Sequence, residues 1–120
     1  MLEGNARLGS GARAVLSDPT SSLILPATAL AEACWVVGKG RTSVADWRDV
    51  VRVVRSDTRI RVVALDAAII ERAMALPVQL EMHDAQIVAT ALIERDRGAD
   101  ARLLTRDKAI ISSGLLAIIW

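Results

Sequence analysis

Short apolar runs alternate along the chain with segments in which apolar residues recur at helical spacing. Four of the runs are rich in leucine or β-branched residues and are mostly non-alternating, which is typical of strands in a parallel sheet that is buried on both faces. They cover residues 23–25, 61–65, 102–104 and 117–120. Helical spacing is found over residues 27–38, 43–56, 66–76 and 83–97. This alternation predicts an α/β domain with a parallel sheet.

Capping residues define several of the expected helix ends. Asp66 closes a strand and precedes a helical pattern, so we expect it to be an N-cap. Ser43 and Asp46 form a weaker capping pair for the start of the helix expected over residues 43–56. Gly38 and Gly98 follow helical patterns and are expected to end them. The first 18 residues suggest the end of one helix and the start of another, with no strand before them.

Length and composition favour a single soluble globular domain over residues 1–120. The chain has 120 residues, of which 52% are hydrophobic and 24% charged, a balance that allows a core and excludes disordered or fibrous classes. The longest uncharged stretch, residues 19–31, contains two prolines and is shorter than the roughly 20 residues of a membrane span. With no export signal at its start and a single cysteine, the chain is expected in the cytoplasm.

Basic residues are concentrated in the middle of the chain, although the formal net charge is +1. Seven basic residues lie between Lys39 and Arg61, where three aspartates oppose them. Arg48, Arg52 and Arg55 share one face of the predicted helix, so they form either a solvated face or a contact with RNA or a protein partner. The chain has no Phe or Tyr and three Trp, so base-stacking platforms for sequence-specific RNA readout are not expected.

Three carboxylates fall at positions where a purely structural role is not the only explanation. Glu32 lies in a predicted helix that is apolar almost all round and therefore expected to be buried, where an acid needs an arginine or a metal ion as its partner. Asp84 opens a helix on the same stripe as Val88, so it is expected to face inward rather than solvent, although the helix dipole alone could favour it there. Asp107 follows the strand of residues 102–104, where an N-cap and a ligand site both fit.

Taken together, the three acids favour a metal site. Converging carboxylates repel each other unless a cation lies between them, and ligation by oxygen alone suits Mg²⁺ or Mn²⁺. Such an ion lowers the pKa of bound water and neutralises phosphate charge, so the reaction class it favours is phosphodiester hydrolysis. We therefore expect Glu32, Asp84 and Asp107 to approach one another at the carboxyl end of the sheet.

The segments around these acids resemble the three C-terminal acidic motifs of PIN-domain ribonucleases, and the small size resembles the VapC-type toxins of bacterial toxin–antitoxin pairs. The matching segments are residues 25–32, 83–91 and 103–107. The resemblance implies a three-layer α/β/α fold and a metal-dependent endoribonuclease that cleaves RNA, is restrained by an antitoxin and can form a homodimer. It also implies that Glu32, Asp84 and Asp107 are catalytic metal ligands, with the hydroxyl of Thr105 in support.

One departure from the family concerns the N-terminus. The family begins with a strand that ends in Asp-Thr or Asp-Ser, whereas residues 1–5 here resemble the helix that follows that strand. The chain is therefore interpreted as an N-terminally truncated PIN-like domain that lacks the central strand and the first catalytic aspartate. The alternative to an active enzyme is a catalytically impaired remnant that serves only as a protein-binding module.

Overall fold

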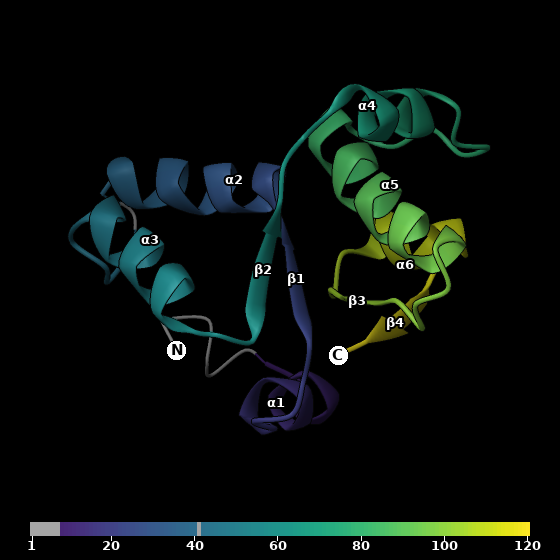
Figure 1. Cartoon of the computed structure of the whole chain (residues 1–120). Helices are drawn as coiled ribbons and strands as arrows, with labels where there is room; N and C mark the ends of the chain where they lie inside the picture. Colours follow the sequence, from purple (N-terminus) through teal and green to yellow (C-terminus); the bar gives the residue numbers. More distant parts are fainter. Residues whose placement is uncertain (1–7, 41) are drawn as a thin grey trace. The chain divides into compact units, whose positions relative to one another are not determined.

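The chain forms two compact units, Met1–Val63 and Ala64–Trp120. A computed structural model describes residues 8–40 and 42–120, and Figure 1 shows the helices and strands of both units. The helix expected at residues 1–5 lies outside the described residues.

The first unit contains one pair of parallel strands and three helices. Along the chain they are α1 (Ser10–Ser17), β1 (Leu23–Pro26), α2 (Ala27–Gly38), α3 (Trp47–Ser56) and β2 (Ile60–Val63). Strands β1 and β2 pair in parallel, with Leu23 opposite Ile60 and Pro26 opposite Val63. Parallel strands need a long crossover connection, which α2 and α3 supply. The predicted parallel pairing and the bounds of the helix over residues 27–38 are confirmed.

Arg59 connects the end of α1 to the start of β2. Its guanidinium group donates hydrogen bonds to the backbone oxygens of Leu16, at 2.8 Å, and Asp18, at 2.9 Å. The same group forms a two-pronged ion pair with Asp57, with N–O distances of 3.1 and 2.8 Å. The hydrogen bonds from Arg59 lower the pKa of the Asp57 carboxyl and the same pair raises the pKa of Arg59. One side chain therefore joins three segments of the first unit.

The expectation that α2 is buried all round is wrong. Thr28 and Val37 are its buried residues, whereas the side chain of Trp35 is 68% exposed and Val36 is also exposed. Within its unit α2 contacts β1 and α3, which cover one side of the helix. Apolar residues on the rest of its surface therefore remain accessible.

The helix expected over residues 43–56 begins later, at Trp47. Asp46 is its N-cap and accepts a hydrogen bond from the Arg48 N–H at 2.9 Å, so the helix start expected at Ser43 is wrong. The hydroxyl of Thr42 accepts the N–H of Val44 at 3.2 Å. This local side-chain turn satisfies a backbone donor without a helix and so delays the helix start.

The second unit contains the other strand pair and three more helices. They are α4 (Ala67–Met74), α5 (Met82–Asp96), β3 (Arg102–Leu104), α6 (Lys108–Ser113) and β4 (Ala117–Ile119). Strands β3 and β4 are parallel, with Arg102 opposite Ala117. Asp66 caps α4 by accepting the N–H of Ile69 at 3.0 Å, as predicted. An ion pair of 3.3 Å between Arg72 and Asp96 joins α4 to α5.

A small apolar core holds the second unit together. Its centre is a cluster of Val88, Leu92 and Ile110, and Val88 is completely buried. Leu103 of β3 and Ile118 of β4 pack against this cluster. The core therefore joins α5 and α6 to the strand pair.

The strands themselves are half-buried rather than buried. The described residues contain two two-stranded sheets, one with order β1-β2 and one with order β3-β4. A two-stranded sheet has no central strand, which explains why the side chains of β1 are all partly accessible. The strand expected at residues 61–65 is shifted to Ile60–Val63. No helix in the described part of the chain has both the length and the apolar character needed to cross a membrane.

Candidate acidic site

Glu32 lies in the second turn of α2. The helix starts directly after β1, with Pro26 as the N-cap residue, so the strand end determines where the glutamate falls on the helix. The side chain of Glu32 is half-buried, and both of its chain neighbours are exposed. It therefore occupies the edge of the apolar surface of α2 and not a closed core, contrary to the expectation from sequence.

Asp84 lies in the first turn of α5, as the third residue of that helix. The N-cap role belongs to Glu81, whose carboxylate accepts the N–H groups of His83 at 3.0 Å and Asp84 at 3.3 Å. The N-cap residue of α5 is therefore Glu81 and not Asp84. The residue is half-buried, and Val88, one turn further along the same stripe, is fully buried. The expected placement on the stripe that leads into the core is confirmed, but Asp84 itself still reaches solvent.

Asp107 caps α6 just beyond the end of β3. Its Oδ1 accepts the N–H of Ile110 at 3.0 Å, and its own N–H donates to Oγ1 of Thr105, also at 3.0 Å. Thr105 thus stabilises the turn that presents the aspartate. Asp107 is exposed, and among the described residues none donates a hydrogen bond to its Oδ2. The second carboxylate oxygen is therefore available to a cation.

The two aspartates belong to the second unit, and each lies close in sequence to a residue of its apolar core. Asp84 lies one helical turn before Val88, and Asp107 lies three residues before Ile110, and both of these apolar residues belong to the same buried cluster. Glu32 belongs to the first unit. Within the described residues of either unit, no group of three or more His, Cys, Asp and Glu side chains has a geometry that could hold a metal ion.

Charge is distributed unequally between the two units. Residues 1–63 contain nine basic and six acidic side chains, and residues 64–120 contain six basic and eight acidic side chains. The predicted arginine face, Arg48, Arg52 and Arg55, is exposed along α3. Arg48 pairs with Asp46 at 3.2 Å and Arg52 pairs with Asp49, while Arg55 has no ion pair among the described residues. The first unit, which has more basic than acidic side chains, thus carries a row of arginines along α3.

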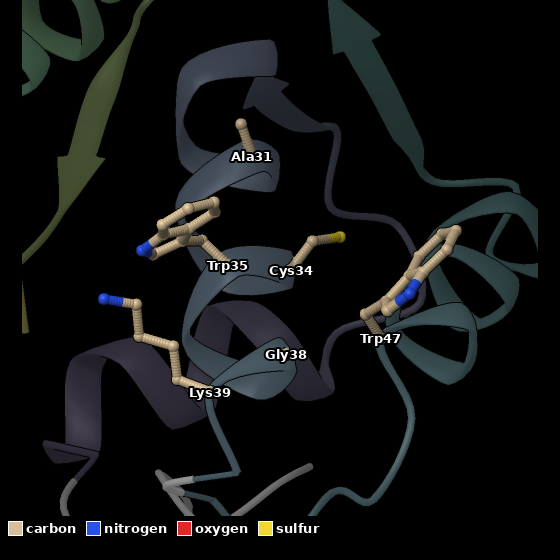
Figure 2. Close-up of a pocket in the computed structure, with 6 residues that line it drawn as sticks. All are labelled: Ala31, Cys34, Trp35, Gly38, Lys39 and Trp47. Carbon is tan, nitrogen blue, oxygen red and sulfur yellow. The ribbon is translucent and has the colours of Figure 1, made fainter.

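A shallow hollow of about 410 Å³ lies between α2 and α3, and Figure 2 shows its lining residues. We call it the tryptophan hollow; its lining consists of Ala31, Cys34, Trp35, Gly38, Lys39 and Trp47. Lys39 lies beneath the ring of Trp35, and the Cys34 thiol points towards Trp47 (Figure 2). The predicted site residues include neither tryptophan. Trp35 of α2 and Lys39, the C-cap residue of that helix, are four residues apart, and this spacing is the signal that could have identified the surface.

Comparison with known proteins identifies the family. The PIN domain family matches residues 5–112. The chain is also similar to a crystal structure of VapBC2 from Rickettsia felis bound to a DNA fragment from their promoter, with 16% identity, a TM-score of 0.61, and coverage of 82% of this chain and 74% of that chain. A search of curated proteins found no match. The structural similarity agrees with the predicted PIN-like α/β/α fold, and because the family match spans most of the sequence, this chain belongs to the PIN domain family.

Proposed function

We propose that this protein is a metal-dependent endoribonuclease and the toxin of a toxin–antitoxin pair. The observation that carries the proposal is the PIN domain match over residues 5–112, because the family consists largely of nucleases. The similarity to VapBC2 supports the toxin assignment, since the small size of this chain resembles that of VapC-type toxins. An antitoxin protein, an RNA substrate and a second copy of the chain are the proposed partners, and the cytoplasm is the proposed location.

The donor set fits a hard divalent cation. Glu32, Asp84 and Asp107 supply carboxylate oxygens, the ligand type that Mg²⁺ and Mn²⁺ prefer. Asp107 uses Oδ1 in the cap of α6, and Oδ2 is available to a cation. Asp84 lies half-buried in the first turn of α5, where its charge is less screened by water than at an open surface. Both aspartates therefore suit an ion that binds beside an RNA phosphate.

The proposed roles follow from these positions. A bound ion would polarise the phosphate and lower the pKa of an attacking water. Asp84 and Asp107 would hold the ion, and the hydroxyl of Thr105 fixes the turn that carries Asp107. Glu32 is proposed as a further ligand on the basis of its sequence motif.

RNA cleavage by the purified chain tests the proposal. We expect a labelled single-stranded RNA to be cut slowly with Mn²⁺ or Mg²⁺, and not at all when EDTA removes the ion. Asp84→Asn and Glu32→Gln should abolish cleavage, because each removes a charged ligand. Asp96→Asn, at the far end of α5, is the matched control and should cut at the normal rate. Cleavage that persists in EDTA, or that survives Asp84→Asn unchanged, would contradict the proposal.

A further inference from the structure

Two of the three tryptophans are exposed in the first unit, and each lies next to a cation. Trp35 is 68% exposed and Trp47 is 44% exposed. The Lys39 ammonium is 5.0 Å from the centre of the Trp35 ring, and the Arg48 guanidinium carbon is 4.7 Å from that of Trp47. Large aromatic side chains left at a surface are typical of binding sites. Ring faces combined with positive charge fit a ligand that is both flat and anionic.

The arginine face extends this surface along α3. A second hollow of about 400 Å³ is lined by Arg48, Arg52 and Arg55 together with Val51 and Ser56. Side chains three or four residues apart on a helix lie about 5–6 Å from one another, so the three guanidinium groups form a row. Arg55, which has no ion pair among the described residues, can bind an anion without breaking an existing contact. Arg48 lines this second hollow and also lies against the ring of Trp47, so the two hollows adjoin at the start of α3.

We propose that this surface, formed by the tryptophan hollow and the arginine face, binds single-stranded RNA. Unpaired bases would stack on Trp35 and Trp47, and the phosphates would lie along Arg52 and Arg55. Stacking accepts any base, so the contact is not specific for sequence, which agrees with the small number of aromatic residues in the chain. The inference rests on the proposed function, because RNA is the substrate proposed there.

The position of Trp35 relates this surface to the acidic residues. Glu32 precedes Trp35 by three residues on α2, so their side chains are neighbours on the helix. A base stacked on Trp35 would keep the adjoining phosphate within about one helical turn of Glu32. The surface would thus position the substrate and not take part in the chemistry.

Fluorescence anisotropy with a labelled 12-nucleotide oligouridylate tests the inference. EDTA is present throughout, so binding is measured without metal and without cleavage. Trp35→Leu and Trp47→Leu keep an apolar side chain but remove the stacking face, and each should weaken RNA binding about 5- to 100-fold. Trp120→Leu, in the second unit, is the matched control and should leave the affinity unchanged. Trp35→Phe should recover part of the lost affinity.

An abasic sugar–phosphate oligomer of the same length separates stacking from charge. Both tryptophan variants should bind this oligomer as tightly as the unaltered chain does. Arg55→Gln should weaken binding of the RNA and the abasic oligomer equally, and should reduce the slope of log K against log salt by about 0.7.

Three outcomes would overturn the inference. One is absence of RNA binding by the unaltered chain, and another is unchanged RNA affinity in folded Trp35→Leu and Trp47→Leu. The third is a dimer or a complex with a protein partner that Trp35→Leu disrupts while RNA affinity stays constant, since the surface would then bind protein. Failure of this inference can be distinguished from failure of the proposed function. RNA that is bound in EDTA but remains uncut with Mn²⁺ contradicts only the nuclease assignment.

Discussion

The Oδ1 atom of Asp107 lies 3.0 Å from the backbone nitrogen of Ile110 and caps α6. Ile110 is buried in the core cluster that also contains Val88. The residue proposed to bind metal therefore also determines where a core helix begins. Structural and catalytic roles of this carboxylate have to be separated by experiment.

Asparagine and alanine at position 107 should separate these roles. Asp107→Ala loses the capping oxygen and should lower the free energy of unfolding by about 1 kcal/mol, whereas Asp107→Asn keeps an oxygen in place and should be nearly as stable as the unaltered chain. Both should lose RNA cleavage, because neither carries the charge. Urea denaturation and a cleavage assay measure the two properties.

The matched control for Asp107 is Asp66, which caps α4 through an equal 3.0 Å hydrogen bond to Ile69. Asp66→Ala should cost about the same stability and retain cleavage at temperatures well below its melting point. An active Asp107→Asn would show that the aspartate is only a cap.

Metal binding should stabilise the chain through Asp84. Mn²⁺ at 100 times its Kd should raise the free energy of unfolding by about 2.7 kcal/mol, because the ion binds the folded state. In Asp84→Asn this increase should disappear, while the metal-free melting temperature should rise because like charges repel less. Asp96→Asn should respond to Mn²⁺ as the unaltered chain does. A variant that loses metal-free stability and keeps its Mn²⁺ response would argue against Asp84 as a ligand.

Truncation of Val88 should destabilise the second unit. This side chain is fully buried in the core cluster, so Val88→Ala loses apolar burial and leaves a cavity, at a cost of about 2 kcal/mol. Val36→Ala, on the exposed side of α2, should change stability by no more than about 0.5 kcal/mol. Equal losses in the two variants, measured by urea denaturation, would mean that the core does not lie at Val88.

The pair of Asp57 and Arg59 should make the first unit sensitive to acid. The folded pKa of Asp57 lies below its ordinary value of 3.8, mainly because its carboxylate accepts hydrogen bonds from the Arg59 side chain. Its contribution to stability is therefore fully present above that ordinary value and is lost as the pH falls through the lower folded pKa.

Melting curves recorded from neutral pH down to about pH 2 check this expectation. Asp57→Asn should be less stable than the unaltered chain at neutral pH and should lose less stability on acidification. If both proteins lose the same stability below about pH 4, the pair makes no contribution to the acid response.

Local features of the fold could be predicted from the sequence, and tertiary features could not. The parallel strands, the span of α2 and the caps at Asp66 and Asp107 follow from periodicity and from the hydrogen-bonding capacity of single residues. The exposure of Trp35 does not, because an apolar helix reveals nothing about which elements cover it. Glu81 was missed as a cap because glutamate is not among the side chains preferred at that position.

The same distinction applies to the candidate site. The helix positions of Asp84 and Asp107 were correct, because each depends on a nearby strand end or helix start. The tryptophan hollow was missed, because it combines side chains from α2 and α3 that are far apart in sequence. Spacing along one helix cannot indicate which residue of another helix lies opposite.

The two parallel strand pairs close loops of very different length. Leu23 pairs with Ile60, 37 residues later, whereas Arg102 pairs with Ala117, 15 residues later. Closing the longer loop costs about 0.8 kcal/mol more chain entropy. Contacts between residues closer in sequence form faster, so β3 and β4 should pair first as the chain folds, and the β1–β2 pair should be the slower step. During that interval the apolar edge of β1 is open to other chains, which makes the first unit the part of the protein most prone to misassembly.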